Sequence, residues 1–294
     1  MTRNHLLLVL LVNALWGFNF IAGKYGTAEF GPMLFITMRF AIVLVLLCLF
    51  LRRVPGQMLR IMTIGLMMGV GHYSFMFYGI YLAGSLSSVA ITSQLTVPFA
   101  TLLAIVFLGE RIRWPRFLAI VTSFSGVVLI GLAPVGPEHL TALALTSIAS
   151  LAMAVSTILM RQLQGVSALN LQAWIALYAT IAMGTITMIL EQPQWQQLAL
   201  IPLREYWTAA YSAIGATIVG HGLQYHLLQR YSVNSVAPFI TLSTLFAIVF
   251  GIVLLDDELT SRIIIGGLLT LLGVTIVAIR NARENAPSGL RVPR

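Results

Sequence analysis

The sequence predicts an all-α integral membrane protein of ten transmembrane helices, arranged as two inverted five-helix repeats around a central cavity. Its composition, an internal duplication and the distribution of its arginines support this fold class. Hydrophobic residues make up 59% of the chain and charged residues 9%, whereas soluble domains carry about 25% charged residues. Because so few polar side chains cannot cover a water-exposed surface, we expect most of the chain to lie in lipid.

The apolar stretches are each long enough to cross the hydrocarbon core, which takes about 20 residues. Short connections join them and leave no room for a soluble domain. The expected spans are residues 6–23, 32–51, 59–81, 86–108, 116–133, 140–160, 170–190, 206–229, 234–255 and 263–280.

Three tripeptides of the first half recur in the second half at a spacing of 147 or 149 residues, about half of the 294-residue chain. The pairs are Val70-Gly71-His72 with Val219-Gly220-His221, Ser88-Val89-Ala90 with Ser235-Val236-Ala237, and Gly126-Val127-Val128 with Gly273-Val274-Thr275. With five spans per copy, the second copy must enter the membrane from the opposite side. Inverted repeats are typical of secondary transporters, whose site lies between the halves near the membrane midplane.

These patterns indicate a single transmembrane transporter domain over residues 1–280. Repeat one covers 1–135 and repeat two covers 136–280. The end of the chain, 281–294, is rich in Pro, Ser, Gly and Arg, and we expect it to be a disordered cytoplasmic tail.

The basic residues are unevenly distributed between the two sides of this topology. With both termini in the cytoplasm, thirteen arginines fall on the cytoplasmic side, against Lys24, Arg204 and Arg262 outside. This is the positive-inside bias of membrane proteins, and removing one span would destroy it. The net charge of +8 therefore reflects topology and attraction to inner-leaflet lipid, not nucleic-acid binding.

Several kinds of chemistry are absent from the sequence. Its only lysine, Lys24, precedes Tyr25, so the Gly-Lys-Ser/Thr phosphate loop of ATP-driven pumps cannot occur. There is no His-Glu-x-x-His pair and no cysteine cluster, and we expect no metal or cofactor. No acidic residue lies deep in an expected span, whereas proton-driven carriers commonly use one. Passage down a gradient is the simpler expectation, with histidine left as an alternative proton acceptor.

Polar side chains within the bilayer are costly unless they face a cavity or a partner helix, so they are the candidate substrate-binding residues. His221, Gln224 and Tyr225 share one face of the eighth span. His72 is the counterpart of His221 in the third span, and Met76 that of Tyr225. One repeat thus offers a polar wall and the other an apolar wall, which suits an amphipathic small molecule. The alternative is that both histidines only bond to neighbouring helices.

Five more residues complete the candidate set. Trp16 lies too deep for the interfacial tryptophan belt and faces either a cavity or the bundle. Tyr78 is the aromatic residue of the third span expected in the cavity, and Ser243 is the expected hydroxyl of the ninth. Pro98 lacks the amide that would bond to the Gln94 carbonyl, which predicts a helix kink and a free carbonyl at Gln94.

Two basic residues are candidates for a gating or charge role. Lys24 at the outer end of the first span could attract a carboxylate or anchor the span in the interface. Arg39 lies about 10 Å inside the second span and needs partners, for which structural pinning is favoured over substrate contact. Separately, Gly126, Gly266, Gly267 and Gly273 predict close contact of spans five and ten, either as a scaffold or as a dimer contact.

The opening residues Trp16-Gly17, Phe20, Lys24, Pro32 and Arg39-Phe40 resemble the first helices of EamA-type carriers in the drug/metabolite transporter superfamily. The stretch from Ser87-Ser88-Val89-Ala90 through Pro98 to Leu108-Gly109-Glu110-Arg111 is similar to the end of that family's fourth helix. The second copy departs from the pattern, with Leu255-Asp256-Asp257-Glu258 where the family has Leu-Gly-Glu.

The resemblance implies ten helices in two inverted repeats, both termini in the cytoplasm, and export of metabolites across a bacterial inner membrane. Within the family, the chain looks most like the YddG-type exporters of aromatic and other neutral amino acids.

We therefore expect a carrier, not an enzyme, that exports hydrophobic or aromatic neutral amino acids or similar metabolites by alternating access. Its central cavity would be lined by spans one, three, four, six, eight and nine. Its partners would be the small-molecule substrate and membrane lipid, and it would be a monomer or homodimer. An exporter of drugs or nucleotide-sugar-like metabolites is one alternative, although the expected buried acid or cavity lysines are missing. The other alternative, an intramembrane lipid-modifying enzyme, would have to use His221 and His226 without a nearby carboxylate.

Overall fold

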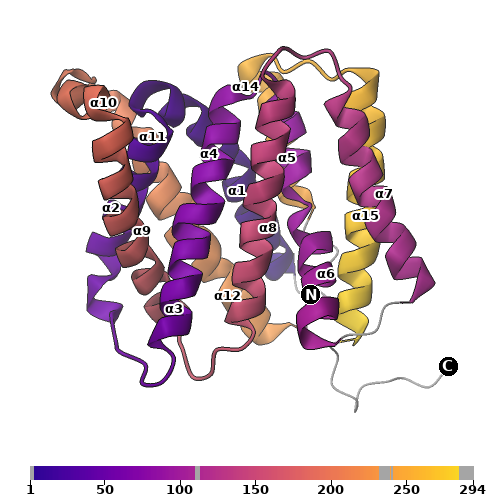
Figure 1. Cartoon of the computed structure of the whole chain (residues 1–294), viewed down its shortest axis with the longest axis horizontal. Coiled ribbons are helices and arrows are strands. Elements are labelled where there is room, and N and C mark those ends of the chain that lie inside the picture. The colour runs from indigo at the N-terminus through magenta and orange to yellow at the C-terminus, as the bar shows by residue number, and fades with distance from the viewer. Residues whose placement is uncertain (1–2, 110–112, 232–238, 240, 285–294) are drawn as a thin grey trace.

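The computed structural model describes residues 3–109, 113–231, 239 and 241–284, and within these ranges every regular element is helical. The helices stand side by side in one bundle (Figure 1). Eight of the described helices are long and apolar enough to cross a membrane. The chain is therefore an all-α, multi-pass membrane protein, as the composition predicts.

The helices follow the order of the expected spans. In the first half they are α1 (Arg3–Phe30), α2 (Pro32–Leu47), α3 (Met58–Gly65) with its π-helical continuation η2 (Leu66–His72) and α4 (Tyr73–Leu82), then α5 (Leu86–Ser93), α6 (Thr96–Leu108) and α7 (Trp114–Gly131). In the second half they are α8 (His139–Met160), α9 (Ala168–Leu190), the short α10 (Gln192–Gln197), α11 (Trp207–Ala210) with the π-helical η5 (Tyr211–Gly220) and α12 (His221–Arg230), α14 (Leu242–Leu255) and α15 (Ser261–Glu284).

The count of ten spans stays a prediction. The eighth expected span is a continuous run of α11, η5 and α12 that is not among the eight candidate spans, and α14, in the ninth, is apolar but shorter. Ser235, Val236 and Ala237, which carry part of the sequence duplication, lie outside the described residues.

The packing of the helices follows an inverted repeat. The fifth span of each half, α7 and α15, pack together, and so do the second spans, α2 and α9. Other large contacts come in exchanged pairs: α1 packs on α14 and η5, while α8 packs on α6 and on η2 with α4. This is the exchange that a two-fold axis between the halves requires. Figure 1 shows the connections after α2 and α8 at one end of the bundle and those after α4, α7 and α14 at the other.

The predicted glycine contacts hold α7 against α15. A β-carbon on Gly126 would overlap the carbonyl oxygen of Gly266, and one on Gly273 would overlap that of Ala119. Gly126 and Gly273 are 147 residues apart, as are Ala119 and Gly266, so these two crossings are symmetry equivalents. The small residues let the two backbones approach closely, as membrane helix pairs commonly do.

The first helix is longer than the expected span that ends at residue 23. α1 continues to Phe30, and Gly31, with φ of 81°, then turns the chain into α2. The positive φ favours glycine, and Pro32 at the start of α2 loses no intrahelical bond. Lys24 therefore lies inside a helix and not in the outer loop. At the other end of the chain, α15 runs to Glu284, so residues 281–284 of the expected tail are helical; 285–294 lie outside the described residues.

The two π-helical segments, η2 and η5, occupy equivalent places in the third and eighth spans. Both adjoin the duplicated Val-Gly-His tripeptide, since η2 ends at His72 and η5 ends at Gly220. π-Helical turns are rare and are found frequently at functional sites. Here each one places a histidine where its span passes the centre of the bundle.

The fourth span of each copy ends in the same backbone conformation. Gly109 after α6 has φ of 67°, and Asp256 after α14 has φ of 51°. Asp256 is the residue 147 positions later and the only non-glycine residue with positive φ among those described. Aspartate is one of the few side chains that tolerate this left-handed conformation. The departure from Leu-Gly-Glu in the second copy therefore preserves the helix ending.

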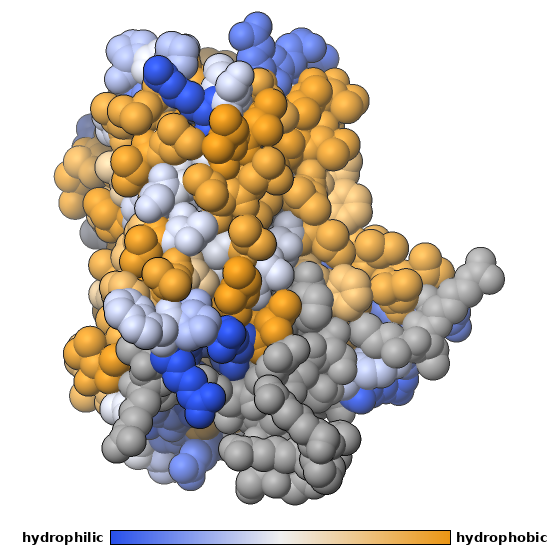
Figure 2. Space-filling view, turned by 90° about the vertical axis from the view of Figure 1, so that its right-hand side faces the viewer, coloured by the Kyte–Doolittle hydropathy of each residue, from blue (hydrophilic) through white to orange (hydrophobic). Residues whose placement is uncertain are grey.

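The outer surface is suited to lipid. Figure 2 shows apolar side chains over the middle of one face, with hydrophilic atoms above and below them. Large exposed apolar residues occur on helices of both halves, among them Val45, Val106, Val128, Ile181 and Val253. In a soluble protein, contiguous apolar patches of this extent would promote aggregation.

Candidate functional site

A cavity of about 290 Å³ lies where the two halves meet, lined by residues from seven of the expected spans. It lies between α1, η2 with α4, the α5–α6 junction, α8, η5 with α12, and α14, as the sequence predicts for spans one, three, four, six, eight and nine. Arg39 of α2 adds a seventh span to this list. Seven of the candidate residues line the cavity: Trp16, Arg39, His72, Met76, Gln94, His221 and Ser243.

Trp16 and His221 form one wall of the cavity. The indole Nε1 of Trp16 donates a hydrogen bond to the Ala216 carbonyl at 3.0 Å, and the ring centroids of Trp16 and His221 are 5.3 Å apart. Gly220 lets the indole approach the π-helical backbone, because a β-carbon there would lie 2.7 Å from Nε1. His221 makes no hydrogen bond within the described part of the chain, so its ring nitrogens are available to a ligand.

His72 faces the cavity from the other repeat. Its Nδ1 lies 2.9 Å from the carbonyl oxygen of Ala149 on α8. Since a carbonyl only accepts, Nδ1 carries the hydrogen, and Nε2 of the neutral ring is left as an acceptor. His72 therefore bonds across helices, as the packing alternative proposed, and also lines the cavity. The two interpretations are compatible because they involve different ring nitrogens.

The junction of α5 and α6 carries Gln94. α5 ends at Ser93 and α6 begins at Thr96, so the helix breaks where Pro98 predicts a kink. Pro98 stands in the first turn of α6, where no amide is needed for the helix. The Gln94 carbonyl, however, accepts a hydrogen bond from the Val97 amide at 3.1 Å. The expectation of a free carbonyl is wrong, because a tighter turn replaces the bond that proline cannot make.

Two cavity residues, Gln94 and Ser243, bond to side chains of α14 and α1. The side-chain amide of Gln94 donates to the hydroxyl of Thr244. The backbone amide of Ser243 donates to the Asn13 side-chain oxygen at 3.1 Å. These contacts fix the apposition of α5, α14 and α1 around the cavity.

Arg39 is almost fully buried, at 2% exposure. Its Nε and Nη2 donate to the Thr217 hydroxyl of η5 at 3.2 and 2.8 Å, and Nη2 also donates to the Tyr73 hydroxyl at 3.2 Å. The guanidinium carbon lies 4.4 Å from the centre of the Tyr73 ring, within cation–π distance. Thr217 in turn donates to the Ser212 carbonyl five residues earlier. The second span is thus joined to the π-helical segment of the eighth.

Other candidates lie elsewhere. Tyr78 is 39% exposed, its ring lies 6.0 Å from that of Tyr81, and it does not line the cavity. It follows Met76 by two residues and so points about 200° away round the helix. Gln224 lies on α12 but lines neither this cavity nor the second one described below. The side chain of Tyr225 lies outside the described part of the structure.

Lys24 has hydrogen-bond partners at the outer end of the third span. Its Nζ donates to the carbonyl oxygens of Ile80, Tyr81 and Ala83 at 3.1, 3.0 and 2.7 Å. These are carbonyls of the last turn of α4 and of Ala83, the residue that follows it, where few intrahelical partners remain. A cation is favourable there because it faces the negative end of the helix dipole. Lys24 therefore closes the outer end of the third span.

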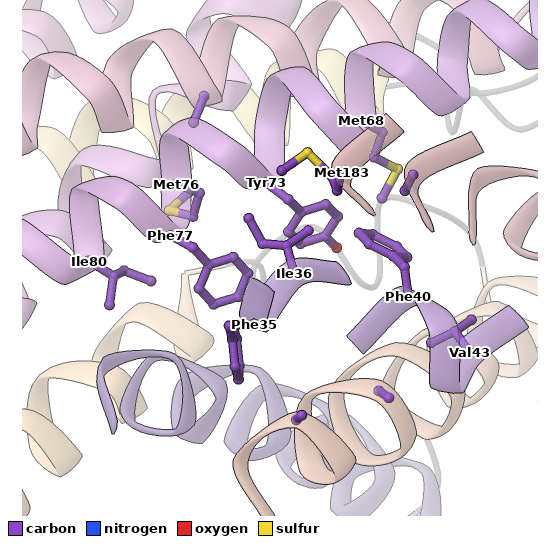
Figure 3. Close-up of a cluster of buried hydrophobic side chains, with 14 of the residues drawn as sticks. Phe35, Ile36, Phe40, Val43, Met68, Tyr73, Met76, Phe77, Ile80 and Met183 are labelled. Carbon is purple, nitrogen blue, oxygen red and sulfur yellow. The ribbon is translucent and has the colours of Figure 1, made fainter. Parts of the chain in front are cut away.

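Several cavity residues were missed by the sequence reasoning. Tyr73, Phe77 and Ile80 share the lining face with His72 and Met76. Figure 3 shows Tyr73, Met76, Phe77 and Ile80 along the same helix, with Phe35 and Ile36 of α2 near them. The signal was present in the 3.6-residue period, which places positions 73, 77 and 80 beside 72 and 76.

A second cavity of about 240 Å³ lies beside the first. It is lined by residues at the end of α2 and the start of α9, and by Thr217, Ile218, His221 and Gly222 of the eighth span. His221 lines both cavities. The imidazole therefore stands at their boundary, and the second cavity lies toward the bundle end that carries the α2–α3 and α8–α9 connections (Figure 1).

Comparison with known proteins identifies relatives that are similar over nearly the whole chain. The chain is 26% identical over 284 residues, covering 94% of this chain and 95% of the relative, to a protein named "Probable amino-acid metabolite efflux pump" from Escherichia coli (strain K12). A protein of the same name from Salmonella typhimurium matches equally, and an "Uncharacterized transporter" from Archaeoglobus fulgidus is 25% identical, covering 89% of this chain and 94% of that one.

A crystal structure shares the fold, with a TM-score of 0.61 at 16% identity, and the match covers 98% of this chain and 100% of that one. The model of the EamA-like transporter family matches the chain twice, over residues 4–132 and 140–279. These two matches cover nearly all of both halves, and the chain belongs to the EamA-like transporter family.

Proposed function

We propose that this protein exports small amphipathic metabolites, in particular neutral amino acids with aromatic or aliphatic side chains, across the bacterial inner membrane. It would do so by alternating access of the cavity between the repeats, with the Arg-rich end of the bundle in the cytoplasm. The relatives named amino-acid metabolite efflux pump support the direction and the substrate class.

The observation that carries the proposal is the content of the cavity. An apolar wall of Trp16, Phe20 and Phe77 stands with polar groups of Arg39 and His72 in one space. Ligand pockets usually measure about 300–1,000 Å³, so a cavity of about 290 Å³ is at the small end. This size favours a single amino acid over a nucleotide sugar or a large drug.

The position of the cavity also supports alternating access. It lies at the junction of two inverted bundles, where rocking of one bundle against the other would open it to either side. The second cavity, reached past His221, provides a route toward the predicted cytoplasmic end. Breaks at η2, η5 and the α5–α6 junction give three of the lining spans places where the backbone can bend.

Counterflow of labelled phenylalanine in proteoliposomes tests the proposal. The wild-type protein is expected to exchange internal unlabelled phenylalanine for external label, and Trp16→Ala to reduce the rate about tenfold because an aromatic contact is lost. Trp114→Ala is the matched control, since Trp114 lies exposed on α7, away from the cavity. Melting temperature and monodispersity report whether each variant is folded.

Two results would contradict the proposal in different ways. If the wild-type protein exchanges none of the twenty amino acids, the substrate class is wrong. If Trp16→Ala exchanges phenylalanine at the wild-type rate, the cavity is not the binding site.

A further inference from the structure

Arg39 lines the cavity, and its guanidinium has donors that no described residue pairs. Of its five N–H groups, the one on Nε and the two on Nη2 face the hydroxyls of Thr217 and Tyr73. Nη1 is buried and has no hydrogen-bond partner. Buried side-chain donors are nearly always paired, so the two N–H groups of Nη1 need an acceptor that the described residues do not supply.

Arg39 also has no counter-ion among the residues that the structure describes. No carboxylate among the described residues lies within ion-pair distance of it. Glu191 and Asp257, two buried acids, are engaged with the amides of Leu34 and Ser87 at helix N-termini. A buried charge without a partner is costly in a membrane, and the Tyr73 ring offsets only part of that cost. An anion would supply both the acceptor and the countercharge.

The group next to Arg39 in the cavity is an acceptor. The His72 and Tyr73 rings have centroids 4.7 Å apart, so the imidazole and the guanidinium both contact the Tyr73 side chain. Since Nδ1 of His72 donates to Ala149, its Nε2 offers a lone pair. One fixed cation and one neutral acceptor within reach of the same ring match a ligand that carries a carboxylate and an ammonium.

We propose that Arg39 and His72 form the head-group subsite of the cavity. The carboxylate of an α-amino acid binds the N–H groups of Arg39 Nη1, and its ammonium donates to His72 Nε2. The ligand side chain lies toward Trp16, Phe20 and Phe77. This inference rests on the proposed function and adds to it the orientation of the substrate and the residue that selects for its carboxylate.

Other ligand classes fit the same groups less well. A dicarboxylate would need a second cation, and Arg39 is the only Lys or Arg side chain among the described residues that line the cavity. A cationic amine without a carboxylate would face Arg39 with like charge, and no acidic residue is among the described lining residues. A zwitterion offers a carboxylate to Arg39 and an ammonium to His72.

The test uses three ligands that differ only at the head group: phenylalanine, phenylalaninamide and 3-phenylpropionate. Binding to the purified full-length protein is measured by the ligand-dependent rise in melting temperature. The wild-type protein is expected to bind phenylalanine at least tenfold more tightly than phenylalaninamide. In Arg39→Gln, phenylalanine binding falls about 10- to 100-fold, as for a lost hydrogen bond to a charged group, while phenylalaninamide binding does not fall, because a like charge has been removed.

The ratio of the two affinities separates recognition from a purely structural role. If Arg39 only braces the bundle, Arg39→Gln weakens both ligands equally and the ratio stays at its wild-type value, which overturns the inference. Arg53→Gln, an exposed arginine in the α2–α3 connection, is the matched control and should keep the wild-type ratio. His72→Phe should reduce the preference for phenylalanine over 3-phenylpropionate. It should leave the preference for phenylalanine over phenylalaninamide unchanged.

A second measurement needs no variant and covers the case in which Arg39→Gln does not fold. Phenylglyoxal modification of Arg39 in the wild-type protein is read by peptide mass spectrometry. Phenylalanine is expected to protect Arg39 at concentrations at which phenylalaninamide does not, and equal protection by both would overturn the inference. If the wild-type protein exchanges phenylalanine, but Arg39→Gln leaves the affinity ratio unchanged and both ligands protect Arg39 equally, only the subsite is wrong. If no amino acid is exchanged, the proposed function itself fails.

Discussion

Glu191 is a buried acid that stabilises a helix end. Its carboxylate accepts hydrogen bonds from the amides of Met33 at 3.1 Å and Leu34 at 2.7 Å, and from the Thr187 hydroxyl at 3.1 Å. These are free amides of the first turn of α2, where negative charge also complements the helix dipole. The Glu191 side chain thus joins the end of α9 to the start of α2.

Asp257 plays the same part for the fourth span. Its carboxylate accepts from the Ser87 amide at 2.7 Å, at the start of α5. Ser85 adds a conventional cap by accepting from the Ser88 amide. Both acids lie at span ends, as their sequence positions predict, and their charges are already used in capping.

Replacing Glu191 by glutamine should destabilise the protein without changing substrate preference. The amide keeps the size of the side chain but loses the charge, which costs about 1 kcal/mol at a partly buried helix N-terminus. Unfolding in a detergent titration measures the loss. Glu205→Gln is the control, because its pair with Arg204 is at the surface and surface pairs contribute little; an equal loss in both variants would contradict the capping role.

At the scale of elements, the third and eighth spans depend on close backbone contacts. A β-carbon on Gly69 of η2 would lie 2.5 Å from the Ala179 β-carbon on α9, and one on Gly65 would lie 2.8 Å from the Tyr178 ring. On η5, the Trp16 indole fills the space next to Gly220. Glycine is therefore required at these crossings because a neighbouring helix fills the space.

Two glycine-to-alanine variants should change stability in opposite directions. Gly69→Ala forces η2 away from α9, and overpacking of this kind costs about 1–3 kcal/mol. Gly222→Ala on α12 meets nothing within 4 Å and should stabilise the helix by about 0.5–1 kcal/mol. Melting temperatures of the two purified proteins give the comparison, and a stability loss of equal size in Gly222→Ala would show that contact is not the cause.

At the scale of the whole molecule, the sequence contains enough to predict the architecture. The duplicated tripeptides and the arginine asymmetry both depend on the order of the spans. The same order is seen in the packing, where the fifth spans, α7 and α15, contact each other and the second spans, α2 and α9, do the same. The cavity follows from the same reasoning, because uncharged polar groups such as His72, Gln94 and His221 must avoid lipid. Their role as substrate contacts stays a prediction.

Side-chain partners from distant segments could not be predicted. Lys24 bonds to carbonyls more than 50 residues away, and no local pattern encodes that contact. The aromatic-rich third span was ambiguous because rings face both lipid and the cavity, and Tyr78 was chosen in place of Tyr73. Arg39 appears in the sequence as a buried charge in need of partners, but only the packed bundle shows which donors remain free.

The unneutralised charge of Arg39 has an electrical consequence for the transport cycle. If the cavity alternates as proposed, this charge faces one aqueous compartment and then the other, and a unit charge crossing the whole field gains about 2.3 kcal/mol per 100 mV. A negative interior should therefore hold empty carriers open to the cytoplasm, ready for cargo. Because a zwitterion adds no net charge, loaded and empty carriers move the same charge across the membrane. Voltage should therefore shift the fraction of carriers open to each side without driving accumulation of the substrate.

Potassium diffusion potentials imposed on proteoliposomes test this expectation. The apparent affinity for phenylalanine should depend on voltage in the wild type and not in Arg39→Gln, and a voltage-driven concentration gradient of phenylalanine would contradict it.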